Sequence, residues 1–186
     1  DTAASALRPL LGPDTMVVTL QNGVAATDMV ARRIGRAHVA GGVAYVAAVI
    51  DEPGRIRHTA LDALIVGELD GAMSPRLLAL RDRAAAAGFA FTASEDIHKD
   101  LWSKFARLSV FSGMTAATRS PLGVLRGSAG LVKLLETAVD EALAVGRALG
   151  VALDDRVRDE VFAMYRGMPP QAKSSPTPGR YSNRTH

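Results

Sequence analysis

The chain changes character at Ser94-Glu-Asp-Ile-His-Lys-Asp-Leu-Trp-Ser-Lys104, where alternating strand and helix patterns give way to helix patterns alone. Ser94 can cap a helix whose first turn carries Glu95 and Asp96, because carboxylates complement the positive end of a helix dipole. The apolar face of this helix continues through Ile97, Leu101, Phe105 and Leu108. We therefore expect a domain boundary between residues 94 and 95.

The residues before this boundary predict a mixed α/β sheet over 1–94. Short, apolar, β-branched runs between turn residues indicate strands at 15–20, 38–50, 55–59, 63–69 and 89–92. Helically spaced apolar residues indicate helices at 3–11, 25–34 and 75–87. Because Pro53-Gly54 is a hairpin-type turn, part of the sheet should be antiparallel.

The residues after the boundary predict an all-α domain over 95–168. Two further helices are expected at 128–149 and 154–166, each followed by a glycine of the kind that ends helices. The apolar residues of the helix at 128–149 lie mostly on one face: Leu131, Leu134, Leu135, Ala138, Leu143 and Leu149. Residues 169–186 hold four of the nine prolines and few apolar side chains, so we expect a disordered tail.

Composition argues against several classes of protein. The chain has no cysteine, and its histidines show no metal-ligand spacing, so we expect no metal site. No apolar run approaches the roughly 20 residues that cross a bilayer, and no signal peptide is recognisable, which predicts a cytoplasmic protein without a membrane partner. The net charge of +3 comes from Lys173, Arg180 and Arg184, so no basic stripe predicts binding to nucleic acid.

Lys104 is the strongest catalytic candidate in the pattern alone. At 100° per residue, four apolar side chains project within about 60° of it: Ile97, Leu101, Leu108 and Phe111. Loss of hydration disfavours the charged form, and a lysine tuned in this way can donate a proton to a developing alkoxide. The alternative is a structural lysine whose side chain reaches past the helix to water.

Asn22-Gly23 is the second candidate. The pair follows the predicted strand 15–20 at its carboxyl end, where ligands bind in open α/β sheets. The same pair is common in plain turns, so both interpretations stay open. The sequence contains no G-x-G-x-x-G phosphate loop. The glycines at 123, 127 and 130 lie in the helical region and do not follow a strand, as such a loop requires.

Three segments carry a family resemblance in their order and spacing. They are Leu20-Gln-Asn-Gly23, then Pro53-Gly-Arg-Ile-Arg-His-Thr59 running into Ile65-Val-Gly-Glu68, then Asp96-Ile with Leu101-Trp-Ser-Lys104, Thr115-Ala and Pro121-Leu-Gly123. Together they resemble the ketopantoate reductase family, the NADPH-dependent 2-dehydropantoate 2-reductases of pantothenate biosynthesis. The resemblance implies an α/β, partial Rossmann-like mixed sheet followed by an all-α helical domain, with the substrate in a cleft between them.

The resemblance also implies roles for particular residues. Lys104 matches the family's general acid, which protonates the 2-oxo group as hydride arrives from NADPH. Asn22 matches an asparagine that touches both substrate and cofactor, and Ala48 falls where the family's backbone lines the cofactor site. Ser112 and Ser175 fall at positions that bind the substrate, a small 2-oxo acid.

This sequence departs from the family at two positions. In the best-known members, asparagines follow the lysine at four and eight residues, whereas Leu108 and Ser112 stand there in this chain. Because leucine cannot hydrogen-bond a pantoate hydroxyl, another 2-oxo acid than 2-dehydropantoate is a candidate substrate.

The likeness covers only part of the family's length. The first βαβ portion with the glycine-rich loop has no counterpart, and no acidic residue follows Ser175. We therefore expect a fragment that is inactive by itself and that exposes an unpaired strand edge. The alternative function is a non-catalytic helical interaction module that forms a homodimer through the helical domain.

Overall fold

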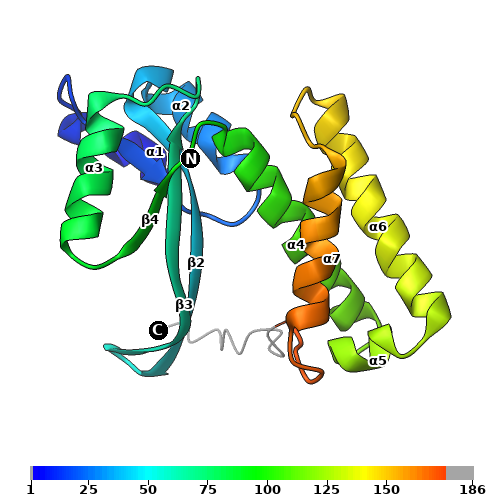
Figure 1. Cartoon of the computed structure of the whole chain (residues 1–186). Coiled ribbons are helices and arrows are strands. Elements are labelled where there is room, and N and C mark those ends of the chain that lie inside the picture. Colours follow the sequence, from blue (N-terminus) through cyan, green and yellow to red (C-terminus); the bar gives the residue numbers. More distant parts are fainter. Residues whose placement is uncertain (1, 175–186) are drawn as a thin grey trace. The chain divides into compact units, whose positions relative to one another are not determined.

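The computed structural model describes residues 2–174, which form two compact units (Figure 1). The division falls after Lys104, inside the long helix α4 (Ile97–Ala117). The predicted change from mixed to purely helical structure is present at the start of this helix. None of the described helices is both long enough and apolar enough to cross a membrane.

A four-stranded mixed sheet forms the centre of the first unit. Its strands are β1 (Val17–Thr19), β2 (Val39–Glu52), β3 (Arg55–Glu68) and β4 (Ala90–Ala93), in the order β1-β2-β3-β4. β2 pairs antiparallel with β3 across the Pro53-Gly54 turn, whereas β1–β2 and β3–β4 are parallel pairs. The mixed sheet predicted from the sequence is therefore confirmed.

The far half of the β2–β3 hairpin extends beyond the other two strands. β1 pairs only with residues 39–41 and β4 only with residues 63–66, so residues 47–60 form a two-stranded ribbon. The register shifts on both sides of Ala47, and Leu61 adopts a φ of 61° opposite this break. The two strands predicted at 55–59 and 63–69 are therefore one strand with a bulge between them.

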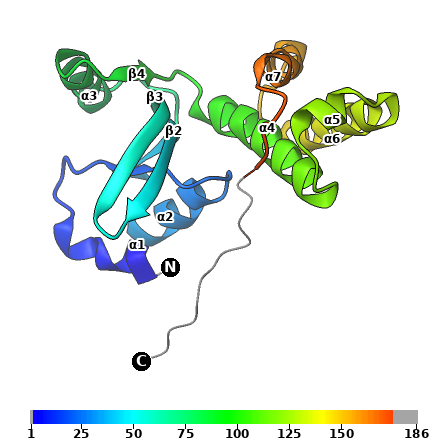
Figure 2. The same ribbon diagram turned by 90° about the horizontal axis from the view of Figure 1, so that it is seen from below.

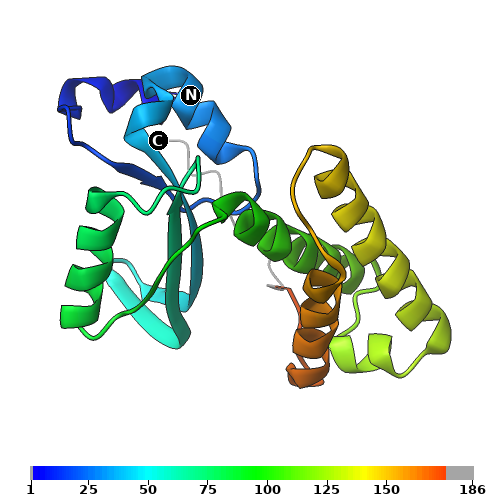
Figure 3. The same cartoon turned by 45° about the horizontal axis from the view of Figure 1, so that its top comes forward.

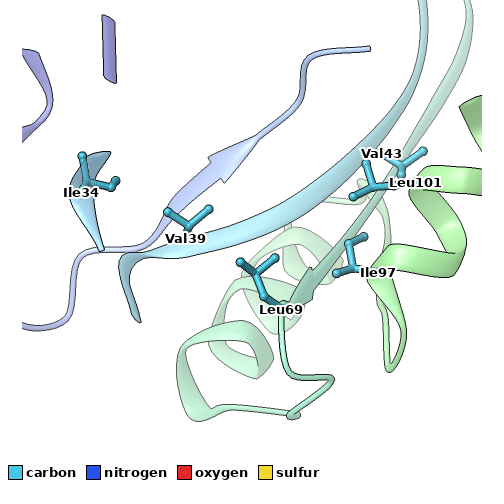
Figure 4. Close-up of a cluster of buried hydrophobic side chains, with 6 residues drawn as sticks. All are labelled: Ile34, Val39, Val43, Leu69, Ile97 and Leu101. Atoms are coloured by element: carbon cyan, nitrogen blue, oxygen red, sulfur yellow. The ribbon is translucent and has the colours of Figure 1, made fainter. Parts of the chain in front are cut away.

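Helices cover both faces of the sheet in the first unit (Figure 2). α1 (Thr2–Ala6), η1 (Arg8–Leu10), α2 (Ala26–Ile34) and η2 (Arg36–His38) precede the hairpin, and α3 (Pro75–Ala86) follows it. The core on one face combines α2, β2 and the first turns of α4 through Ile34, Val39, Val43, Leu69, Ile97 and Leu101 (Figure 4). On the other face, Leu77 of α3 packs against Ala40 and Val66.

Two glycines allow α4 to lie close against the sheet. A Cβ on Gly41 would lie 2.8 Å from Ile97 Cγ1, and a Cβ on Gly67 would lie 2.8 Å from the Ser94 backbone oxygen. The Asp96 side chain caps the helix, because its Oδ1 accepts a hydrogen bond of 3.0 Å from Lys99 N. The cap predicted at Ser94 is thus two residues early; Ser94 Oγ instead accepts from Asp96 N at 3.1 Å.

Substitution of Gly67 with alanine is expected to destabilise the first unit by about 2 kcal/mol. The new methyl group would meet the backbone of Ser94, which cannot rotate away, so the strand or α4 must shift. Urea unfolding would measure this loss. Gly130→Ala is the matched control, because its Cβ would meet nothing within 4 Å and alanine favours its helix. Equal stability of the two variants would contradict the close packing of α4.

The second unit is a helical assembly (Figure 3). It contains the second half of α4, α5 (Leu122–Arg126), α6 (Ala129–Ala148) and α7 (Asp155–Gly167). α6 and α7 run antiparallel, and each buries a row of side chains four residues apart: Leu135, Val139 and Leu143, then Val157, Val161 and Tyr165. Two leucines assigned to the apolar face of α6, Leu134 and Leu149, are exposed.

The start of the predicted tail contacts helix α5. The first backbone N–H groups of α5 lack partners within their own helix, and Pro170 O and Ala172 O accept hydrogen bonds from Gly123 N and Leu122 N. Gly123 permits this contact, since a Cβ there would lie 2.8 Å from the Pro170 Cβ. The first residues of the predicted tail thus contact α5, and residues 175–186 lie outside the described residues.

Candidate active site

Lys104 is held against strand β2. It lies two turns into α4, beyond Ile97 and Leu101, which are buried in the core of the first unit. Its Nζ donates a hydrogen bond of 2.8 Å to the Ala44 backbone oxygen and lies 5.7 Å from the centre of the Tyr45 ring. The side chain is half-buried. The structure therefore places this ammonium on the sheet, instead of extending it to water past the helix.

The entry into α4 is fixed by a buried polar contact. Ser94 is buried, donates from Oγ to Asp100 Oδ2, and joins its backbone N–H to the Val66 oxygen at 2.8 Å. Burial raises the pKa of Asp100, while the hydrogen bond from Ser94 opposes that rise. Asp100 precedes Lys104 by one helical turn, so this contact fixes the segment that carries the lysine.

Asn22 lies just beyond the carboxyl end of β1, as predicted, and it is exposed. The next residue, Gly23, has a φ of 99°, and no atom lies within 4 Å of the position a Cβ would take. A buried contact of 2.8 Å between Thr19 Oγ1 and Thr27 Oγ1 ties the end of β1 to the first turn of α2. The loop is thus held at both ends and leaves Asn22 open to a ligand.

Ala48 is an exposed residue of β2, paired with His58 in the ribbon part of the hairpin. It directly follows the double register shift at Ala47. The lysine contacts the same strand four residues earlier, at Ala44. Ala48 thus lies on the strand that Lys104 of α4 contacts, four residues beyond the point of contact.

Ser112 and Ser174, the residue before Ser175, lie together in the helical unit. Ser112 is half-buried on α4. Ser174 Oγ lies 2.8 Å from Thr115 Oγ1 and donates a long hydrogen bond of 3.5 Å to the Ser112 backbone oxygen. Ser174 N also donates to Thr115 Oγ1 at 3.2 Å. Ser175 itself lies outside the described residues, so its predicted role stays a prediction.

Sequence reasoning missed the two residues that hold Lys104. Ala44, 60 residues before the lysine, acts through its backbone oxygen, and Tyr45 is one aromatic residue in an apolar strand. No local spacing could have indicated this contact. The only available signal was the pair Gly41-Gly42, since small residues in a strand mark close approach of another element.

A charged pocket lies at the other end of the sheet from Asn22, where β2 begins and β3 ends. It has a volume of about 400 Å³ and includes Glu68, Ser74 and Arg76 in its wall. Arg76 binds both carboxylate oxygens of buried Glu68 at 2.6 Å, and the bond to Arg76 holds the Glu68 pKa below its usual value. These groups satisfy one another, which indicates a structural role. No group of side chains that could hold a metal ion occurs within residues 2–174.

Comparison with known proteins identifies two consecutive family segments. Residues 1–71 match the model described as "Ketopantoate reductase PanE/ApbA", and residues 96–177 match "Ketopantoate reductase PanE/ApbA C terminal". A 2-dehydropantoate 2-reductase of Mesorhizobium japonicum is 33% identical over 169 residues, which cover 80% of this chain and 52% of the relative. The chain spans about half the length of the curated relatives it matches.

Solved structures show the same fold. A PanE/ApbA family ketopantoate reductase from Ralstonia eutropha superposes with a TM-score of 0.80 and 30% identity, covering 94% of this chain and 56% of that protein. A D-mandelate dehydrogenase solved with NADH shares the fold at a TM-score of 0.77 and 20% identity, covering 89% of this chain and 55% of that one. With both family segments matched in order, the chain belongs to the ketopantoate reductase family, a family of NAD(P)-dependent oxidoreductases.

Proposed function

We propose that this chain carries the proton-donating part of a reductase that converts a 2-oxo acid into a 2-hydroxy acid with a nicotinamide cofactor. The observation that supports this most directly is the placement of Lys104 on β2, half-buried and bonded to Ala44 O. A lysine held in this way can donate a proton at a fixed position. Family membership supports the reaction class and does not favour the alternative of a non-catalytic helical module.

The chemistry assigned to this chain is a proton transfer. A bound nicotinamide would supply the hydride that adds to the 2-oxo carbon. The Lys104 ammonium gives its proton to the carbonyl oxygen, which becomes the hydroxyl of the product, and the neutral amine then regains a proton from water. Asn22, exposed at the end of β1, would contact substrate and cofactor, and the β2 backbone at Ala48 would line the cofactor.

The proposal extends to the cofactor, to the location and pathway, and to the substrate. We propose NADPH as the cofactor and a cytoplasmic location with a role in pantothenate biosynthesis, supported by the name of the Mesorhizobium japonicum relative. For the substrate we propose 2-dehydropantoate or a related 2-oxo acid, bound with help from Ser112 and Ser175. Leu108, one turn after Lys104 on α4, offers no hydrogen bond to a substrate hydroxyl and so supports a less polar 2-oxo acid.

The test is a chimeric enzyme. The region of the Ralstonia eutropha reductase that aligns with this chain would be replaced by this chain, so that the relative supplies the remaining parts. Oxidation of NADPH and NADH would be followed with 2-dehydropantoate, 2-oxoisovalerate and phenylglyoxylate. We expect turnover with at least one acid. A folded chimera that binds NADPH but reduces none of them would contradict the proposal.

A further inference from the structure

The place where Lys104 meets β2 has two partners with different chemistry. The Ala44 carbonyl lies in the sheet and accepts a hydrogen bond of 2.8 Å from Nζ. The next residue, Tyr45, places its ring 5.7 Å from the same nitrogen, and it packs against the cluster that contains Ile97 and Leu101. Successive residues of one strand thus contact one ammonium, through the backbone and through a side chain.

Both partners attract a positive charge. A carbonyl oxygen accepts hydrogen bonds from an ammonium, and the face of an aromatic ring carries partial negative charge, which attracts a cation within about 6 Å. These interactions oppose the loss of hydration that partial burial causes. The strand therefore favours the ammonium form, the form that a proton donor needs before the reaction.

A substitution can remove the Tyr45 ring but not the Ala44 backbone oxygen. The Ala44 oxygen belongs to the backbone, so any residue at position 44 supplies it. The ring, in contrast, depends on the identity of residue 45, and it is therefore the part of the contact that a substitution can remove. A leucine or threonine at position 45 would preserve the strand but remove the interaction with the ring.

We propose that Tyr45 is a positioning residue for the proton donor, whose ring keeps the Lys104 side chain on β2 and favours its ammonium form over the free amine. The role of Tyr45 in catalysis rests on the proposed function. The contact between Tyr45 and Lys104 does not, because it lies within the first unit. Tyr45 acts through the lysine and takes no proton itself.

Two charged groups of the same helix lie within one turn of the lysine. Asp100 precedes it by one turn and favours the ammonium, although Ser94 holds that carboxylate from the other side. Arg107 follows by three residues and disfavours a second positive charge. On β2, the titratable group in contact with the lysine is Tyr45. Substitution of Tyr45 leaves Asp100 and Arg107 in place, so their effects are common to all variants compared.

The experiment measures how readily Lys104 reacts as a free amine. The purified chain would be labelled with acetic anhydride from pH 6 to 11, and the extent at each of the four lysines would be read by peptide mass spectrometry. In Tyr45→Leu, we expect the midpoint of the Lys104 profile to fall by about half a pH unit. In Tyr45→Phe, which keeps the ring, the profile should match that of the parent chain.

Internal controls come from the same sample. Lys133 is exposed on α6 and should give one profile in all variants. Should Tyr45→Leu not fold, as judged by circular dichroism, Tyr45→Met provides a flexible apolar replacement of similar reach. An unchanged Lys104 midpoint in the folded leucine or methionine variant would overturn the inference, and so would an equal shift in Tyr45→Phe.

The labelling result is separable from the reductase assignment, because it requires neither cofactor nor turnover. A shifted midpoint with an inactive chimera would support the contact and contradict the proposed reaction. An active chimera with no shift in Tyr45→Leu would overturn the role of Tyr45 alone.

Discussion

Lys104→Met is expected to lower the kcat of the chimeric reductase by about 100- to 10,000-fold, the range that a positioned general acid contributes. Methionine keeps a similar length and can fill the space between α4 and β2, but it has no proton to donate. Because the lysine acts when negative charge develops on the substrate oxygen, kcat should fall much more than substrate affinity.

Steady-state kinetics with the best 2-oxo acid would measure this effect. Lys133→Met is the matched control, since it removes an exposed lysine of α6 and should leave kcat unchanged. Retention of more than a tenth of the parent kcat by Lys104→Met would contradict the role of this residue as the acid.

Arg76→Ala is expected to cost about 2–3 kcal/mol in the free energy of unfolding. Arg76 makes a two-point contact with Glu68, whose side chain is only 7% exposed, and it also donates to Ala37 O at 2.7 Å. Its removal leaves a buried carboxylate with Ser74 as its remaining described donor. Loss of one partner from a fully buried pair costs about 3–5 kcal/mol, and the partial exposure of Arg76 reduces that figure.

The control for this variant lies on the same helix. Arg81 of α3 pairs with Asp82 at the surface, and both side chains are largely exposed. Arg81→Ala should therefore change stability by less than about 0.5 kcal/mol. Similar losses for Arg76→Ala and Arg81→Ala in urea unfolding would show that the Glu68 contact contributes no more than a surface pair.

The same pair predicts a dependence on pH. The Glu68 pKa is lowered in the folded chain, chiefly by the hydrogen bond from Arg76, so the folded state binds this proton less tightly than the unfolded chain does. Its stabilising effect is therefore complete above the unfolded pKa of about 4.3 and is lost as the pH falls through the folded value. Glu68→Gln should lose less stability than the parent chain between pH 6 and 3.

Local patterns predicted most of the elements that carry the candidate site. The β-branched run before Asn22, the hairpin turn at Pro53-Gly54 and the helical spacing from Ile97 onward depend only on neighbouring residues, and the structure contains all three elements. These patterns respond to burial on one face, which sequence periodicity records directly.

The errors arise where partners distant in sequence decide the outcome. Leu61 joins two predicted strands into one because β2 continues to pair on both sides of the bulge. The contact of the chain after α7 with the start of α5 could not be predicted either, because N–H groups of Leu122 and Gly123 bind carbonyls about 50 residues later. The contact of Lys104 with Ala44 and Tyr45 likewise depends on packing between segments 60 residues apart.

The break in register at Ala47 and Leu61 separates the hairpin into two hydrogen-bonded blocks. The outer block has a cross-strand pair, Ile50 and Ile56, that is 75% and 72% exposed, so little burial opposes its local opening. The inner block contains Ala44, paired with Leu64 and supported by β4. Fraying of the hairpin tip therefore stops at the bulge, and amide exchange at the tip can be rapid while the carbonyl that holds the lysine stays in place.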